Sequence, residues 1–256
     1  MLEAATLALD GRLNGVTASL RPGEITAICG PNGAGKSSLL QCLAGLLAPD
    51  RGAVVLDGTP IAALRPRERA RAIGYLPQHG EIAWEMSVRN LVALGRLPHG
   101  AGESQIDQAL TLLDLETLSS RPVNTLSGGE KARALLARVL AGEPRWILAD
   151  EPLAALDLAH QLGLIRRFRQ AAQAGAGVVL VLHDLALAMN HADRVLVLDH
   201  GALVADGPPV RALGAGLIER VWGVAVSWLG EPGARALVPG QAASDAGAPS
   251  AGRGLL

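Results

Sequence analysis

The segment that most restricts the fold of this chain is Gly30–Ser37, a glycine-rich run with the sequence GPNGAGKS. It follows an apolar run, Ile25–Cys29, and it precedes a segment with leucines at helical spacing, Ser38–Leu47. The pattern GxxxxGK(S/T), in the order strand, loop and helix, is typical of loops that hold phosphate groups. Glycines allow successive backbone N–H groups to point inward, and the helix N-terminus adds its positive end. The segment therefore predicts a phosphate cradle in an α/β protein.

Each residue of this loop is a candidate for nucleotide binding. We expect the backbone to hold the β- and γ-phosphates of ATP, Lys36 to add a mobile positive charge, and the hydroxyl of Ser37 to bind Mg2+, which prefers hard oxygen ligands. The alternative is a glycine-rich turn that only caps a helix, and the strand and helix on either side argue against it. The expected nucleotide-binding residues of the loop are Gly30, Pro31, Asn32, Gly33, Ala34, Gly35, Lys36, Ser37 and Ser38.

Short apolar runs recur along the chain and alternate with segments of helical period. Strands that alternate with helices favour a mainly parallel sheet covered on both faces. We therefore expect an α/β fold with a P-loop NTPase core. The expected strands are Ile25–Cys29, Val54–Leu56, Trp146–Ala149, Val178–Leu182 and Val195–Leu198.

Residues from about 84 to 142 read differently, as helices without strands between them, and we interpret them as a helical subdomain inserted in the core. Residues 1–238 then form one nucleotide-binding domain, in which Val224, Val226 and Trp228 alternate like a late strand. Residues 239–256 are rich in Ala, Gly, Ser and Pro, so we expect a disordered tail. The expected helices of the insertion are Ser87–Leu94, Ser104–Leu115 and Ser127–Leu140.

Two carboxylates end one of the expected core strands. Trp146–Ala149 runs directly into Asp150 and Glu151, and open α/β sheets bind their ligands at the carboxyl ends of their strands. We expect Asp150 to reach the magnesium ion and Glu151 to orient or deprotonate the attacking water, a role worth about 10²- to 10⁴-fold in rate. By itself, an apolar run that stops at acidic residues is a weak signal. Next to a phosphate loop it predicts phosphoryl-transfer chemistry.

Composition limits the partners that this chain can have. The formal net charge of -1 and the pI near 6.6 give no argument for nucleic acid as a partner. Cys29 and Cys42 show no metal-ligand spacing, so we interpret both as reduced packing residues. No apolar run approaches the ~20 residues that cross a bilayer, and residues 1–11 lack a targeting pattern. If this protein acts at a membrane, we expect another chain to span it.

A second glycine-containing motif precedes one of the expected helices. Leu126–Glu130 reads LSGGE, and Ser127 with Glu130 has the spacing of a capping box, which any amphipathic helix can carry. A cap does not need two glycines, however. Gly128 and Gly129 bare the backbone of the first helical turn, so that an external anion can approach its free N–H groups.

At these residues the sequence resembles the ATP-binding subunits of ABC transporters, and the resemblance covers nearly the whole chain. It implies an N-terminal antiparallel β subdomain beside the P-loop core. It also implies that Ser127, Gly128 and Gly129, with Glu130, bind the nucleotide held by the phosphate loop of a second copy. ATP would then join two copies in a homodimer.

The remaining motifs of that family fall in the expected order. Gln78 matches the loop glutamine between the core and the helical subdomain, and it is implied to contact the magnesium ion and to take part in catalysis. Ala155-Leu156-Asp157 matches the loop that faces the partner, with Asp157 near the nucleotide. His183, after Val178–Leu182, matches the switch histidine of catalysis near the γ-phosphate. A histidine after a strand is by itself more often structural, so order and flanks carry this assignment.

The sequence departs from the family pattern at the positions expected to cover the nucleotide base and at a position next to the acidic pair. The first strand region, Leu7–Val16, contains no aromatic residue that would stack on adenine. Arg12 or Leu13 is expected to cover the base less well, so purine selectivity should be weak. Glu130 replaces the commoner glutamine, and Leu153 stands where a hydroxyl residue often follows Glu-Pro.

Two segments resemble one group of importers. Asp10–Val16 looks like the shortened N-terminal region of vitamin B12 importer subunits, and Ser87–Arg96 is similar to iron-chelate (siderophore and haem) importer subunits. The resemblance implies transmembrane permease subunits docked at Gln78–Gly100, and a periplasmic or surface substrate-binding protein. Trp84 and Met86 are expected to fill a groove that receives a short helix of the permease, and a place in the core is the alternative for Trp84. The resemblance also implies a peripheral ATP hydrolase at the cytoplasmic face of the inner (plasma) membrane.

Three rival readings stay open at this point. A soluble ABC ATPase of an assembly pathway, such as iron-sulfur cluster biogenesis, would have no membrane permease to co-purify with. A P-loop kinase or GTPase would leave Leu126–Glu130 without a role. Half of an exporter would usually carry fused membrane helices.

Overall fold

A computed structural model describes residues 1–78, 86–100, 102–154 and 156–240 of the chain. Its larger sheet has the strand order β10-β9-β3-β8-β7-β6, in which only β10 runs antiparallel to its neighbour. The mainly parallel sheet predicted from the sequence is confirmed. The strands are β3 (Ile25–Cys29), β6 (Ile73–Leu76), β7 (Trp146–Asp150), β8 (Gly177–Val181), β9 (Arg194–Asp199) and β10 (Ala202–Gly207).

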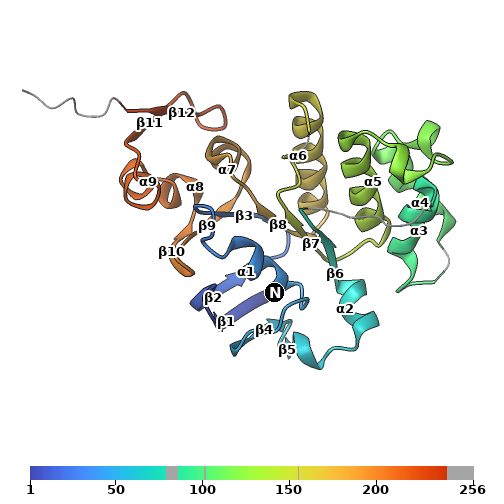
Figure 1. Cartoon of the computed structure of the whole chain (residues 1–256), viewed down its shortest axis with the longest axis horizontal. Coiled ribbons are helices and arrows are strands. Elements are labelled where there is room, and N and C mark those ends of the chain that lie inside the picture. Colours follow the sequence, from blue (N-terminus) through green and yellow to red (C-terminus); the bar gives the residue numbers. More distant parts are fainter. Residues whose placement is uncertain (79–85, 101, 155, 241–256) are drawn as a thin grey trace, which may run out of the picture.

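This sheet is covered on both faces because its central strands are almost entirely apolar. Every residue of β3, β7 and β8 is buried. Neighbouring side chains of β3 enter different cores: Ala27 joins the helical layer, and Ile28 joins α1 (Lys36–Leu43) and the smaller sheet. Figure 1 shows α1 between the two sheets. Helices α6 (Leu158–Gln173) and α7 (Leu185–His191) cover the other face of the larger sheet.

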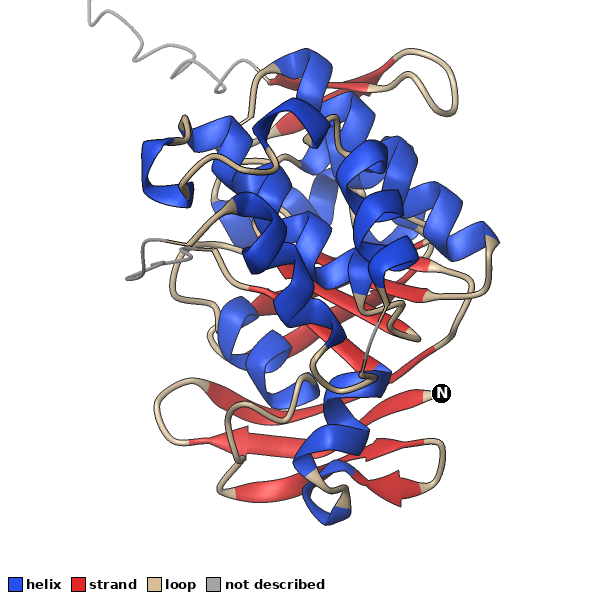
Figure 2. Cartoon of the chain, turned by 90° about the vertical axis from the view of Figure 1, so that its right-hand side faces the viewer, coloured by secondary structure: helices blue, strands red, loops and turns tan. Residues whose placement is uncertain are grey.

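The smaller sheet is antiparallel and forms a separate layer at the bottom of Figure 2, as the family resemblance implied. Val54–Leu56 was expected as a strand and ends β4, but it belongs to this sheet rather than to the parallel one. Leu7–Val16 is not a single strand, because the chain turns between Leu9 and Leu13, where the N–H of Arg12 donates to the carbonyl of Leu9 at 2.9 Å. The strands are β1 (Leu2–Leu9), β2 (Leu13–Leu20), β4 (Arg51–Leu56) and β5 (Thr59–Pro60).

Helices α3 (Val88–Ala93), α4 (Glu103–Leu112) and α5 (Gly128–Ala141) form the inserted segment between β6 and β7. They pack on one another through a common apolar core. Helix α4 ends three residues before the predicted Leu115, and Asp114 has a left-handed φ of 52° that no helix can continue through. Trp84, expected at the start of this segment, lies outside the described residues.

The last described elements extend the core beside β9 and β10. They are α8 (Pro209–Ala212), α9 (Ala215–Trp222), β11 (Val226–Leu229) and β12 (Ala236–Pro239), and β11 pairs antiparallel with β12. The predicted strand near Trp228 is therefore confirmed. Pro239 was expected in the tail, but it pairs with Val226 and closes β12. The rest of the expected tail, 241–256, lies outside the described residues.

Helix α2 (Pro66–Ala72) connects the smaller sheet to β6. Across the part of the chain that the structure describes, no helix combines the length and apolar character that a bilayer crossing requires.

Candidate nucleotide-binding site

The loop between β3 and α1 needs glycine at two close approaches of the backbone. A Cβ atom on Gly30 would lie 2.2 Å from the carbonyl oxygen of Leu198, and one on Gly35 would lie 2.4 Å from that of Arg12. Gly35 also has a φ of 96°, in the left-handed region that favours glycine. The loop thus turns tightly into α1, whose first residue is Lys36, and the free N–H groups of the helix start face the loop.

A cavity of about 410 Å³ opens at this loop and gathers most of the predicted site. It lies at the carboxyl end of the parallel strands, where open α/β sheets bind ligands. Residues from the loop, from the end of β6, from the end of β7 and from the end of β8 reach it. It is lined by Arg12, Asn32, Gly33, Ala34, Gly35, Lys36, Ser37, Ser38, Gln78, Glu151 and His183.

Lys36 is the buried cation of this cavity. Its side chain is only 6% exposed, and its ammonium donates to the carbonyl oxygens of Gly30 and Pro31, both at 2.9 Å. Burial lowers the pKa of Lys36, because desolvation disfavours the charged form more than nearby Glu151 favours it. The loop carbonyls therefore hold an ammonium that an incoming anion can recruit.

Ser37 and Asp150 form the oxygen pair expected for magnesium. The hydroxyl of Ser37 donates to Oδ1 of Asp150 at 3.1 Å, and Asp150 is 3% exposed at the end of β7. Burial raises the pKa of Asp150, and the hydrogen bond from Ser37 opposes this only in part. A carboxylate that is desolvated and accepts one hydrogen bond has oxygen lone pairs left for a hard cation.

We expect Asp150→Asn to stabilise the nucleotide-free chain at pH 7. A carboxyl whose folded-state pKa is raised contributes most stability below its unfolded pKa, and this contribution is lost as pH rises through the folded pKa. Asparagine stays neutral and can still accept from Ser37, so we expect a higher free energy of unfolding and a Tm increase of about 2–4 °C. Thermal melting would test this, with the exposed Asp10→Asn as control. A lower Tm for Asp150→Asn alone would contradict it.

Glu151 has the backbone and the partners of a positioned carboxylate. Its φ of 49° is left-handed, which costs a non-glycine residue about 1 kcal/mol. The Nε2 amide of Gln78 donates to Oε2 of Glu151 at 2.7 Å, and Nε2 of His183 contacts Oε1. Three residues from three strand ends therefore meet at one carboxylate. The sequence predicted their presence in the site but not that Glu151 would be their common partner.

The serine-glycine motif lies apart from this cavity. Ser127 caps α5, accepting from the N–H of Glu130 at 3.3 Å, while its own N–H donates to Glu130 at 2.7 Å. The capping box is therefore confirmed. A Cβ atom on Gly128 would meet nothing within 4 Å, so packing inside this chain does not require a glycine there. None of Ser127, Gly128, Gly129 and Glu130 lines the cavity.

The predicted loop that faces a partner leads into another helix cap. Asp157 caps α6 by accepting from the backbone N–H of His160 at 2.9 Å, and the ring Nδ1 of His160 lies 2.7 Å from the same oxygen. These contacts lower the pKa of Asp157. Asp157 does not line the cavity either, and Ala155 of the same motif lies outside the described residues.

Arg12 and Leu13, the two residues expected to cover the nucleotide base, lie in different surroundings. Leu13 is buried in the core of the smaller sheet, at 1% exposure, so the expectation that it covers the base is wrong. Arg12 is exposed in the turn before it and lines the cavity. The difference follows from their places in the chain, since Leu13 begins β2 and faces the core, whereas Arg12 lies in the turn before that strand.

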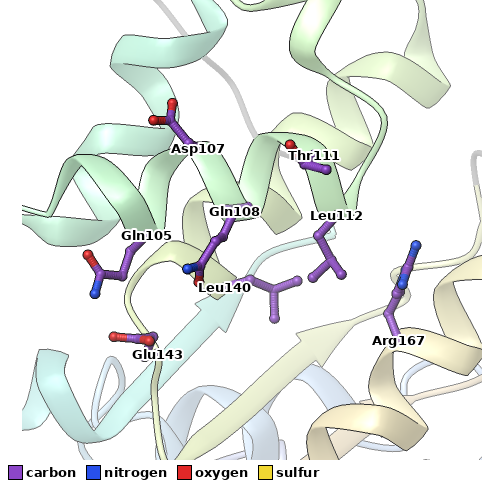
Figure 3. A pocket seen from close by; sticks show the side chains of 9 residues that line it. Gln105, Asp107, Gln108, Thr111, Leu112, Leu140, Glu143 and Arg167 are labelled. Atoms are coloured by element: carbon purple, nitrogen blue, oxygen red, sulfur yellow. The ribbon is translucent and has the colours of Figure 1, made fainter.

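A larger cavity, about 660 Å³, lies between α4, the end of α5 and α6. Figure 3 shows its lining, with Glu143 and the amides Gln105 and Gln108 on one side and Arg167 on the other. It contains no glycine-rich loop and no helix start that would hold a phosphate. The smaller cavity at the phosphate loop is therefore the candidate site.

A glycine-rich loop between a parallel strand and a helix, with a buried aspartate and a positioned glutamate beside it, defines a P-loop nucleotide-binding protein. Comparison with known proteins makes the class specific. The ABC transporter family model matches residues 13–154, more than half of the chain. The chain belongs to the ABC transporter family, and it is an ATP hydrolase of the ABC type.

The hemin import ATP-binding protein HmuV of Myxococcus xanthus is 43% identical over 240 residues, covering 88% of this chain and 90% of that protein. A structure described as an inward-facing ABC transporter of metal-chelate type is 26% identical with a TM-score of 0.78, covering 93% of this chain and 96% of that one. The dimeric ATP-binding cassette MJ0796, bound to ADP and Pi, is 26% identical with a TM-score of 0.73, covering 82% and 99%.

Proposed function

We propose that this chain powers an ABC importer for haem or a related iron chelate, as one of two ATP-binding subunits that close on ATP. One observation supports closure on ATP. The phosphate loop, Glu151, His183 and Gln78 line one cavity, whereas the start of α5 at Ser127 lies outside it and is left to bind the nucleotide of another copy. The haem substrate rests on the similarity to the hemin import protein of Myxococcus xanthus.

The second half of the site would come from another copy of the chain. Gly128 has open space where a side chain would stand, and the first N–H groups of α5 have no partner in the helix. This helix start suits a phosphate group that approaches from outside. The dimer of the ATP-binding cassette MJ0796 supports a pair in which Ser127, Gly128, Gly129, Glu130 and Asp157 meet the nucleotide of the opposite copy.

The residues of the cavity fit ATP with magnesium. Lys36 would exchange the carbonyls of Gly30 and Pro31 for β- and γ-phosphate oxygens, which bind an ammonium more strongly. Ser37 and Asp150 supply two hard oxygens 3.1 Å apart, and Gln78 can add its amide oxygen. Magnesium held there would neutralise the phosphate charge. These residues bind and orient the triphosphate.

Hydrolysis would depend on Glu151. Its carboxylate, held between Gln78 and His183, would orient an attacking water and accept its proton. His183 would then steady the γ-phosphoryl group as charge develops on it. Because Gln78 directly precedes the residues that lead to the helical segment, it would transmit closure to a membrane partner.

The partners follow from this role. Transmembrane permease subunits would dock near Met86 and the start of α3, and a periplasmic or surface substrate-binding protein would act on the other side of the membrane. The chain itself would lie at the cytoplasmic face of the inner membrane. Co-purification with a permease separates this function from that of a soluble ABC ATPase in an assembly pathway, which would purify without one.

A direct test compares uptake of haem in cells that produce this chain with its permease and in cells that produce the Glu151→Gln variant instead. We expect labelled haem to accumulate only with the unaltered chain. Equal accumulation in both would show that this chain does not power the uptake, and accumulation of a different chelate alone would reject haem as the substrate.

Arg12 should contribute to base binding by stacking its guanidinium on the purine. We expect Arg12→Ala to raise the Kd for ATP by about 3- to 10-fold, the range of a partly desolvated cation–π contact. Arg12→Tyr should restore affinity and increase preference for ATP over GTP. The backbone carbonyl of Arg12, not its side chain, packs against Gly35, so the loop should keep its shape. Fluorescent nucleotide titration would measure both, and an unchanged Kd for Arg12→Ala would exclude the contact.

A further inference from the structure

Helix α2 and the residue before it carry positive charge that the nucleotide site does not use. Residues 65–71 contain four arginines and one glutamate, and none of the residues of α2 is buried. Ala72, its last residue, packs partly buried against the core of the smaller sheet, and the polar remainder of the helix is open to contacts with its surroundings or with a partner. Figure 1 shows α2 at the outer end of β6.

Two of these arginines hold a neighbouring loop. Arg67 and Arg71 lie one helical turn apart, and Nε of each donates to the carbonyl oxygen of Pro98, both at 2.7 Å. Both side chains are exposed. Their Nη groups make no hydrogen bond within the described part of the chain, so these donors are free for an anion.

The loop held by these arginines displays Leu97, which is 71% exposed, more than any other large apolar side chain in the described ranges. Leu46 is 59% exposed. Next to it, a Cβ atom on Gly45 would lie 2.8 Å from Cδ of Arg69. We call Arg65, Arg67, Arg69, Arg71, Leu46 and Leu97 the arginine–leucine patch.

The carboxylates next to this patch are already paired. Glu68 binds Arg65 at 2.5 Å, and Glu143 binds Arg96, the neighbour of Leu97, at 3.1 Å. Arg67, Arg69 and Arg71 have no acidic partner in the described ranges. The patch therefore keeps a net positive charge and also exposes two leucine side chains.

We propose that the arginine–leucine patch binds an anionic membrane surface, with lipid phosphate groups as ligands of Arg67 and Arg71 and with Leu97 in the interfacial layer. Guanidinium groups match phosphate in geometry and charge, and anionic leaflets attract clustered basic residues. Protruding leucines favour a lipid surface over nucleic acid, which single-strand binders hold with stacking aromatics. This contact belongs to the chain itself and goes beyond its role beneath a permease.

The test is sedimentation of the purified full chain with vesicles of phosphatidylcholine alone or with added phosphatidylglycerol. We expect binding only to the anionic vesicles, and loss of it in high salt. Arg67→Gln/Arg71→Gln should weaken binding about 30-fold, because each basic residue near such a surface contributes about 1 kcal/mol. Arg67→Lys/Arg71→Lys keeps the charge but loses the guanidinium geometry, so it should weaken binding less than the glutamine pair does. Leu97→Ser should weaken binding about fivefold.

The matched control is Arg211→Gln/Arg220→Gln, which removes the same charge from exposed positions on α8 and α9. It should bind vesicles as the unaltered chain does, and basal ATP hydrolysis should be the same for both glutamine pairs. Equal loss in the control pair, or equal binding to neutral vesicles, would overturn the proposal. So would an Arg67→Gln/Arg71→Gln variant that binds vesicles normally but no longer co-purifies with its permease, since the arginines would then serve a protein surface. Competition by inorganic phosphate at millimolar concentration would indicate a free-anion site and also overturn it.

Discussion

Replacing Glu151 with glutamine is expected to lower kcat for ATP hydrolysis by about 10²- to 10⁴-fold, the range that a general base contributes. Glutamine keeps the size of the side chain and can still bond to Gln78 and His183, which hold Glu151 now. It cannot accept a proton from water. Nucleotide binding should change little, because Lys36 and Ser37, the residues expected to hold the phosphates and the magnesium ion, are unaltered.

The measurement is steady-state phosphate release at saturating ATP, with the Kd for ATP determined separately on the same protein. Glu219→Gln, an exposed position on α9, is the matched control and should hydrolyse ATP at the normal rate. Near-normal turnover by Glu151→Gln would show that another group accepts the proton.

Lys36→Ala is expected to raise the Kd for ATP by about 10- to 150-fold, the factor that corresponds to the loss of a hydrogen bond to a charged group. The ammonium is buried, and its present acceptors are only the carbonyls of Gly30 and Pro31. A triphosphate is a much stronger acceptor for it. Binding of ATP should therefore depend on this side chain more than on any other in the loop.

Isothermal titration with ATP would measure this effect on monomeric protein. The control is Lys131→Ala, the same substitution at the only other lysine of the chain, which lies on α5 outside the cavity. It should leave the Kd unchanged. An unchanged Kd for Lys36→Ala would contradict the prediction that this loop binds the phosphates of ATP.

The sequence predicted the phosphate loop, the acidic pair and the strands that carry them because each has a strong local cause. β3, β7 and β8 are buried on both faces and read as continuous apolar runs, and the glycines of the loop are required by contacts such as that of Gly30 with Leu198. Short strands that are not buried throughout were harder. β6 and β10 escaped prediction, and the sheet to which β4 belongs was not predicted, because the pairing partner of a short strand is decided by distant residues.

The details of the site depended on contacts between residues far apart in the chain. Neither the convergence of Gln78 and His183 on Glu151 nor the burial of Leu13 behind Arg12 has a local sequence signal. The convergence arises because the ends of parallel strands meet at one edge of the larger sheet, and the burial of Leu13 arises from the packing of the smaller, antiparallel sheet. The roles assigned to Ser127–Gly129 and Asp157 require a second copy, so they stay predictions.

Closure of two copies on ATP is tested most directly by the molar mass of the Glu151→Gln chain with ATP and magnesium, measured by light scattering, with and without Gly128→Glu. A Cβ atom on Gly128 meets nothing within 4 Å in the single chain, so the added glutamate should not disturb folding. It should repel a triphosphate presented by a second copy. Gly216→Glu on α9 has equally open surroundings and is the control. We expect an ATP-dependent dimer for Glu151→Gln and for the Gly216 control, and a monomer once Gly128→Glu is added. A dimer that persists with Gly128→Glu would contradict this expectation.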